Sequence, residues 1–405
     1  MHNRGMGTAS PAISGRPAQS QVLRSRFIDS LRGISILLVI LYHGDDFFTV
    51  QASALAPLFP TQLTAVLFQR GYYGVTIFFV ISGFLITRIS LARYGALNAI
   101  RPGRFYLFRF GRIAPCLGLT LIVLLTLHFT HVRDFVYDTE KTSISELLTY
   151  TLTFRYNLLF CKNGWGLLPW DILWSLSIEE VFYFFFPVLC LLLRTPRAIL
   201  SCCLLLLAGG PIARFTGATD FDKLYGYFSC FDLIALGCAT AIIQSFVTTQ
   251  IVGRKLFLAV SGLGICFSIC AIATMPIPNQ IVWGPTFLGI GIALLLFGMV
   301  GSEHHSRSFS AALSWPLRIL GKRSYEIYLF HGTILLLLVN YLKSLDFDLV
   351  SYSPTFLPLF VLICVLIGEL IGKFWSEPAN RFVRRLSLDV IFQPRNGRGL
   401  GRELK

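Results

Sequence analysis

The sequence predicts an all-α membrane protein, a polytopic bundle of about ten transmembrane helices. Apolar residues make up 54% of the 405 residues and charged residues only 14%, against roughly 25% charged residues in an ordinary soluble domain. The mean hydropathy is +0.66. Apolar runs of about 20 residues, the length that crosses a bilayer as a helix, recur along the chain. This composition excludes a soluble enzyme, a disordered chain, a collagen-like rod and a secreted disulfide scaffold.

Ten apolar runs are long enough to span the bilayer. Lipid offers the backbone no hydrogen bonds, so each run must be helical, and the many glycines in the runs favour close helix packing. A weaker segment, 144–160, contains Glu146, Arg155 and Asn157 and is expected to lie at the outer interface. The ten runs cover residues 28–48, 72–92, 112–130, 172–193, 198–215, 228–248, 256–276, 282–301, 324–342 and 355–375.

The basic residues predict the orientation of the bundle. With ten spans and a cytoplasmic N-terminus, 25 of the 35 lysines and arginines fall in cytoplasmic segments and eight in external ones, as the positive-inside rule requires. A crossing at 144–160 would remove most of this bias. We therefore expect both termini to be cytoplasmic, with a disordered tail over residues 1–26, a transmembrane domain over 27–386 and a basic tail over 387–405.

The same loops account for the net charge of +14, so we expect membrane lipid and no nucleic acid as a partner. The predicted location is a bacterial-type inner (cell) membrane. The ten cysteines show no CxxC spacing and are expected to be apolar filler, not disulfides or a zinc site. His128 and His131 lie one turn apart without a third ligand, so no metal is predicted. The sequence does not indicate the oligomeric state.

Arg32 and His43 are two of the few ionisable residues inside the predicted spans, where charge is costly and functional by default. They are eleven residues apart, which places them on one side of a helix, about 16 Å apart along its axis. Arg32 would lie near the cytoplasmic face and His43 about two-thirds of the way across. A substrate entering from the cytoplasm would suit this arrangement. Snorkelling of Arg32 and a structural hydrogen bond of His43 are the alternative.

Glu179 belongs to a polar stripe with Ser175 and Tyr183 on the fourth span, since the three residues recur at every fourth position. Counting along the helix places Glu179 at the depth of His43. A carboxylate there would fix the tautomer of the imidazole and raise its basicity. A purely structural pair between two helices is the alternative.

Arg109 and Arg112 lie one turn apart, just before the third span. Paired guanidinium groups at a membrane mouth can bind phosphates, although contacts with lipid head groups would explain them as well. His331 is expected about 10 Å from the inner face; Glu326 precedes it by five residues, and Glu369 on the last span is expected at a similar depth. These three residues form either a second polar layer with Arg32 or a buried structural network.

Seven segments, in this order, resemble motifs of the membrane-bound acyltransferase family 3, the O-antigen and exopolysaccharide O-acetylase type. The resemblance covers about residues 27–385. The last segment has Glu-Pro where the family has Glu-x-Pro, and Gly-Thr follows His331 where the family often has a Trp-Pro-like pair. The segments are FIDSLRGISILLVILYH, GVTIFFVISGFLIT, RFGRIAP, WSLSIEEVFYFFFP, FDLIALGCATA, GKRSYEIYLFHGTI and WSEPANR.

The resemblance implies an O-acetyltransferase. Its donor would be acetyl-CoA or another acyl-CoA on the cytoplasmic side, and its acceptor a hydroxyl of a carbohydrate or lipid-linked glycan. By position, Arg32 and His43 match the family's first-helix pair. Arg109 and Arg112 match its Arg-x-x-Arg motif, and Glu179 matches its fourth-helix carboxylate. We expect His43 to act as general base and Glu179 to orient it; direct transfer and an acyl-His43 intermediate both stay open. The residues expected to hold the donor are Arg32, Arg109, Arg112 and His331.

A proton-coupled transporter of a glycan or small molecule is the main alternative, because Arg, His and Glu inside the membrane are also typical of transporters. The absence of an inverted sequence repeat and the seven ordered motifs argue against it. A flippase-like scaffold for exopolysaccharide assembly would fit the fold but has no residue signature in the sequence.

Overall fold

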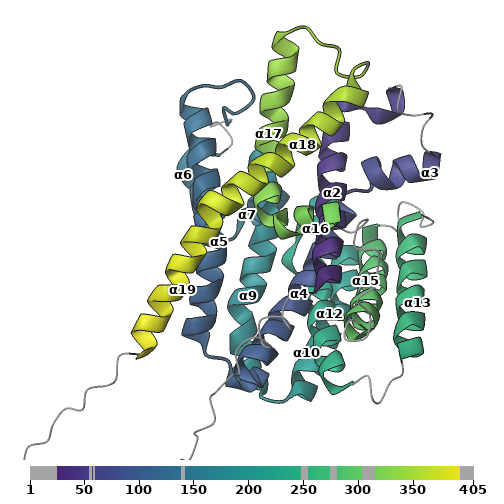
Figure 1. Cartoon of the computed structure of the whole chain (residues 1–405), viewed down its shortest axis with the longest axis vertical. Helices are drawn as coiled ribbons and strands as arrows, with labels where there is room; N and C mark the ends of the chain where they lie inside the picture. Colours follow the sequence, from purple (N-terminus) through teal and green to yellow (C-terminus); the bar gives the residue numbers. More distant parts are fainter. Residues whose placement is uncertain are drawn as a thin grey trace, which may run out of the picture.

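The computed structural model describes residues 25–53, 57, 60–137, 142–247, 254–273, 281–302 and 315–392, and within these ranges all regular structure is helical (Figure 1). The long helices of this part of the chain form one bundle. They are α2 (Arg26–Phe48), α4 (Tyr73–Tyr94), α5 (Pro102–Phe129), α9 (Leu173–Leu193), α10 (Pro196–Thr216), α12 (Tyr227–Phe246), α13 (Arg254–Ala273), α15 (Gly284–Ser302), α17 (Ser324–Ser344) and α18 (Ser353–Ile371).

Each of the ten predicted spans coincides with one of these helices. In the described ranges, nine helices are long and apolar enough to cross a membrane, and α15 contributes a shorter apolar stretch, Gly284–Met299. The predicted all-α membrane bundle is therefore confirmed, and the chain is an integral membrane protein. The orientation of the termini stays a prediction.

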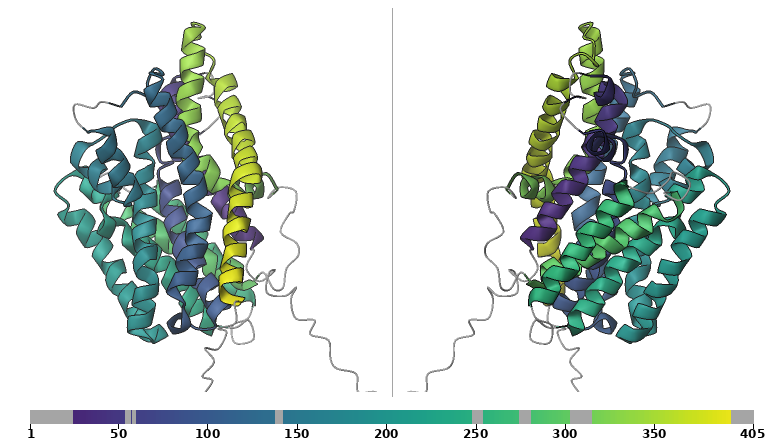
Figure 2. Two further views of the ribbon diagram at one scale, coloured as in Figure 1. Left: turned by 90° about the vertical axis from the view of Figure 1, so that its left-hand side faces the viewer. Right: turned by 90° about the vertical axis from the view of Figure 1, so that its right-hand side faces the viewer.

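The predicted tails fall mostly outside the described residues, which begin at Ser25 and end at Phe392. A π-helical turn, η6 (Gly372–Ser376), joins α18 to α19 (Glu377–Phe392), so helix continues into the segment predicted as the basic tail. Figure 2 shows α18 and α19 as one nearly continuous rod along an edge of the bundle.

Two short helices occupy the segment predicted to lie at the interface. They are α6 (Ile144–Leu152) and α7 (Tyr156–Asn163), and Phe154 between them has a positive φ of 55°. At 1.5 Å per residue each helix is about 12–14 Å long, far short of the roughly 30 Å hydrocarbon core. The geometry agrees with a segment that does not cross the membrane.

Glycines allow α4 and α12 to pack backbone against backbone. A Cβ added at Gly83 on α4 would clash with the carbonyl of Ile234, and one at Gly237 on α12 would clash with the carbonyl of Val80. Small residues at membrane helix contacts allow this close approach. On its other side α4 contacts α2, which also packs against α16 (Trp315–Lys322), α17 and α18.

A buried ion pair connects α10, α12 and α15. The Arg214 guanidinium donates to Asp232 Oδ2 at 2.7 Å and to the Val282 carbonyl at 2.7 Å, and the Thr286 hydroxyl donates to the same carboxylate at 2.7 Å. The Arg214 and Asp232 side chains are 1% and 0% exposed. Arg214 lies in the last turn of α10 and is buried against Asp232.

Replacement of Arg214 should destabilise the fold strongly. Arg214→Met leaves the Asp232 carboxylate buried without a positively charged partner, a change that typically costs about 3–5 kcal/mol. Thermal unfolding in detergent measures the loss. Lys223→Met is the matched control, because it removes the partner of Asp220, which is 71% exposed, and exposed pairs contribute only about 0–1 kcal/mol. Equal melting temperatures for the two variants would contradict a stabilising role of the buried pair.

Candidate active site

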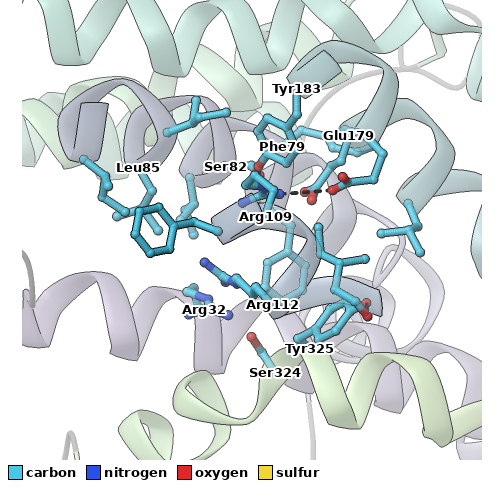
Figure 3. A pocket seen from close by; sticks show the side chains of 18 of the residues that line it. Arg32, Phe79, Ser82, Leu85, Arg109, Arg112, Glu179, Tyr183, Ser324 and Tyr325 are labelled. Atoms are coloured by element: carbon cyan, nitrogen blue, oxygen red, sulfur yellow. Dashed lines mark hydrogen bonds and ion pairs between the residues drawn. The ribbon is translucent and has the colours of Figure 1, made fainter. Parts of the chain in front are cut away.

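A cavity of about 180 Å³ brings together most of the predicted donor-site residues (Figure 3). Helices α2, α4, α5, α9 and α17 contribute its walls. Its lining carries more positive than negative charge, since four arginines face two glutamates. The polar residues of this arginine cavity are Arg32, Arg93, Arg109, Arg112, Glu179, Glu180, Ser82, Ser90, Ser175, Ser324, Tyr94, Tyr183, Tyr325 and Tyr328.

Arg32 and Arg112 contribute two neighbouring positive charges to this cavity. Arg32 comes from α2 and Arg112 from α5, and their guanidinium groups lie close together (Figure 3). Both side chains are half-buried, and neither forms a salt bridge with any residue that the structure describes. Two neighbouring guanidinium groups repel each other unless an anion lies between them, and phosphate oxygens match their geometry. The arrangement is that of an anion-binding site.

Arg109 differs from Arg112 although it lies only one turn earlier on α5. Its Nη2 lies 3.1 Å from Glu180 Oε1, and its guanidinium is 3.6 Å from the centroid of the Tyr183 ring. Arg109 is thus already neutralised in part and fixed in position. The sequence treated the two arginines as equivalent, whereas the structure leaves only Arg112 without a carboxylate partner among the described residues.

Glu179 lines the arginine cavity and does not hydrogen-bond to His43 in the described part of the chain. The predicted pairing of these two side chains was wrong. A count of residues along a helix gives the depth of a side chain but not the direction in which it points. Glu179 on α9 faces Arg109, while α2 carries His43 on the face that packs against α17.

His43 contacts His331 instead. His331 Nε2 lies 3.2 Å from His43 Nδ1, and the ring centroids are 5.0 Å apart. His331 Nδ1 lies 2.6 Å from the carbonyl oxygen of Tyr328, and His43 Nδ1 lies 3.0 Å from the carbonyl oxygen of Val39. His331 is buried, whereas His43 is half-buried.

These contacts assign the tautomers of the neutral imidazole pair. A carbonyl oxygen can only accept a hydrogen bond, so His331 Nδ1 carries the proton and its Nε2 is an acceptor. His43 Nδ1 must then be the donor, shared between His331 Nε2 and the Val39 carbonyl. His43 Nε2 is consequently unprotonated, and its lone pair is available to a proton donor outside the pair.

The predicted depths of His43, about two-thirds of the way across, and His331, about 10 Å from the inner face, cannot both be right, because the two rings are in contact. Helix α16 packs across the start of α2, and a Cβ at Gly321 would clash with the carbonyl of Asp29. Helix α17, which follows α16, also contacts α2. Ser324, its first residue, lines the same cavity as Arg32. His331 therefore reaches the level of His43 and does not line the arginine cavity.

The residues expected to form one polar layer with Arg32 belong to separate groups in the structure. Glu369 pairs with Arg323 through two hydrogen bonds of 2.7 and 2.9 Å, and Arg323 also lies 2.7 Å from Glu377. This group holds the α18–α19 junction to the start of α17. Glu326 is buried and interacts electrostatically with Arg32.

Tyr328 separates the arginine cavity from the imidazole pair. It lines the cavity, its ring centroid lies 5.6 Å from that of His331, and its hydroxyl lies 2.7 Å from Ser175 Oγ. The sequence analysis did not single out Tyr328. Its spacing of three residues from His331 was the available signal, because such residues share one helix face.

The fold and this site define a membrane-embedded protein in which an arginine-lined cavity lies next to an imidazole pair. The chain belongs to the acyltransferase family 3: the family described as "Acyltransferase domain" matches residues 25–369. This confirms the resemblance inferred from the sequence. No solved structure matches the chain.

Three bacterial relatives are similar over most of the chain. O-acetyltransferase OatA of Staphylococcus aureus is 26% identical over 369 residues, which cover 87% of this chain and 57% of the relative. Peptidoglycan O-acetyltransferase OatA of Listeria monocytogenes is 27% identical over 327 residues, covering 76% and 49%. Putative peptidoglycan O-acetyltransferase YrhL of Bacillus subtilis is 27% identical over 336 residues, covering 76% and 48%. The chain spans about half the length of these relatives.

Inorganic pyrophosphate should bind in the arginine cavity and raise the melting temperature of the protein. Arg112→Gln should weaken this binding about tenfold or more, because a hydrogen bond to a charged group contributes about 1.5–3 kcal/mol and each 1.4 kcal/mol corresponds to a factor of ten. Arg197→Gln, an exposed arginine on α10, is the matched control. Equal pyrophosphate affinity in both variants would rule out Arg112 as an anion ligand.

Proposed function

We propose that the protein transfers an acyl group, an acetyl group in the simplest case, from acyl-CoA to a hydroxyl of a cell-surface or exported glycan. One observation carries the proposal. Arg32 and Arg112 lie close together in a cavity that Tyr328 also lines, and the Tyr328 ring contacts His331 of an imidazole pair with an unprotonated nitrogen. The relatives with peptidoglycan in their names support a cell-wall glycan as the class of acceptor.

The donor suits the charge of the arginine cavity. The phosphates of acyl-CoA would bind Arg32 and Arg112, with the exposed Arg93 at the mouth. The concentration of basic residues in the predicted cytoplasmic segments supports entry of the donor from that side. Arg109, held by Glu180, would contribute positive charge and rigidity, and Glu179 would tune the charge of the same cavity.

His43 would act as the general base. Its Nε2 takes the proton of the acceptor hydroxyl while the hydroxyl oxygen attacks the thioester carbonyl. The new C–O bond forms, the C–S bond breaks, and His43 returns the proton to the leaving thiolate. General base catalysis contributes roughly 10²–10⁴-fold, and the alignment of the two substrates supplies much of the remainder. Direct transfer is favoured because a thiolate is a good leaving group.

His331 and Tyr328 would support this step without touching the donor phosphates. His331 accepts the His43 Nδ1–H bond and so keeps Nε2 free of a proton. The Tyr328 ring stands between the thioester and His43, and it must turn aside for the acyl group to reach the acceptor. The orienting role that the sequence gave to Glu179 thus passes to His331.

Replacement of His43 should separate binding from chemistry. His43→Ala should lower the rate of acetyl transfer by roughly 10²–10⁴-fold, because the acceptor hydroxyl loses its base. Release of CoA from acetyl-CoA in the presence of a glycan measures the rate. Thermal stabilisation by acetyl-CoA should be unchanged and serves as the control for folding and donor binding. A variant with near-normal transfer would remove His43 from the mechanism.

Replacement of His331 should reveal whether it positions His43. His331→Phe removes the acceptor of the His43 Nδ1–H bond, so the imidazole can adopt the other tautomer, and kcat should fall while the KM for acetyl-CoA stays constant. His331→Gln restores an acceptor oxygen and should recover part of kcat. A raised KM for acetyl-CoA with an unchanged kcat would instead support the donor-binding role that the sequence suggested.

A further inference from the structure

His43 is accessible from a direction other than the arginine cavity. The side chain is half-buried, yet it does not line that cavity. It lies in the last turns of α2, at the end of the helix away from Arg32. The Tyr42 ring lies 5.1 Å from the His43 ring, and Asp46 follows one turn after Tyr42. Tyr42 and Asp46 are thus the neighbours of His43 at this end of α2.

A cluster of aromatic side chains reaches the protein surface and interacts electrostatically with Tyr42 through Tyr225. Trp165 is 67% exposed and lies 6.1 Å from the Tyr225 ring. Tyr225 also packs 4.6 Å from Trp174 and is close enough to Tyr42 for the two hydroxyl groups to interact electrostatically. We call Trp165, Trp174, Tyr225 and Tyr42 the aromatic strip; distances join ring centroids.

The polar groups of the strip have no partners among the described residues. The hydroxyls of Tyr42 and Tyr225 form no hydrogen bond there, and neither atom is one of the buried unsatisfied ones, so both are accessible. The Asp46 side chain is exposed and forms no hydrogen bond within the described ranges either. In contrast, the hydroxyls of Tyr227 and Tyr156 bond to Phe154 and Asp171.

We infer that the aromatic strip binds the pyranose rings of the acceptor glycan and delivers a sugar hydroxyl to His43. The inference rests on the proposed function. Flat aromatic faces cover the apolar C–H face of a sugar ring, and tyrosine combines such a face with a polar group. The hydroxyls of Tyr42 and Tyr225 can donate to or accept from sugar hydroxyls, and the Asp46 carboxylate can accept from them. A purely apolar ligand would leave these three groups unpaired, and an anionic one would be repelled by Asp46.

The inference gives the two substrates separate entrances. The donor would reach the imidazole pair through the arginine cavity and past Tyr328. The acceptor would reach His43 Nε2 from the opposite end of α2, along the aromatic strip. No exchange of substrates through one opening would be needed.

The test uses the full chain in lipid nanodiscs, with acetyl-CoA as donor and the pentamer of N-acetylglucosamine as acceptor probe. Tyr42→Phe and Tyr225→Phe each remove a single hydroxyl and retain the ring packing. Each should raise the KM for the pentamer about 2- to 10-fold, the range for loss of one hydrogen bond, without changing the KM for acetyl-CoA. Tyr341→Phe, a 62% exposed tyrosine on α17 outside the strip, is the matched control.

A binding measurement without turnover separates this inference from the proposed function. The pentamer should quench tryptophan fluorescence in a saturable way, and Trp165→Ala should weaken both the quenching and the affinity. If transfer occurs but the double variant Tyr42→Phe/Tyr225→Phe keeps the normal KM for the pentamer, the strip is not the acceptor site and the proposed function stands. If the pentamer binds through the strip but acetyl-CoA is not consumed, the proposed function fails and the site remains. Absence of both saturable quenching and transfer overturns the inference.

Discussion

Two guanidinium groups face each other inside a membrane protein without a carboxylate between them in the described residues, and this repulsion is the constraint on which the functional account depends. A charge within the bilayer region is costly unless it is paired or hydrated. Three other arginines of the described residues pair with carboxylates: Arg214 with Asp232, Arg323 with Glu369 and Glu377, and Arg109 with Glu180. Carboxylate partners are thus supplied where the arginines are structural. Arg32 and Arg112 lack one because their charge is directed into a cavity that can admit an anion.

The packing of the bundle keeps these two charges together. The position of Arg32 is set by α2, which packs against α16, α17 and α18. The position of Arg112 is set by α5, whose Pro115 carbonyl accepts a hydrogen bond from Trp375 of η6. The same junction contains the Arg323 ion pairs. Loss of the α18–α19 junction would therefore release both the start of α17 and the middle of α5. These ion pairs fix the positions of the helices that carry the site residues. They do not themselves contact a substrate.

The sequence was sufficient to predict the helices and to select the polar residues, because both depend on local composition. The ten apolar runs became ten helices, and Arg32, Arg109, Arg112 and Glu179 meet in one cavity. The pairing within the site was not predictable by the same reasoning. A residue count along a helix gives the depth of a side chain only if the helix is assumed to begin at the membrane surface, and the contact between His331 and His43 contradicts the depths obtained in this way. Direction around the helix axis depends on which neighbour packs there, and only the three-dimensional structure provides it.

The most direct test of the central claim is a structure of the protein bound to a non-transferable thioether analogue of acetyl-CoA. The account predicts phosphate oxygens within hydrogen-bond distance, about 2.7–3.2 Å, of the Arg32 and Arg112 guanidinium groups. It also predicts the Tyr328 ring turned aside, with the acyl carbon in the passage toward His43. An analogue bound with its phosphates away from both arginines, or with its acyl group separated from His43 by intact packing, would contradict it.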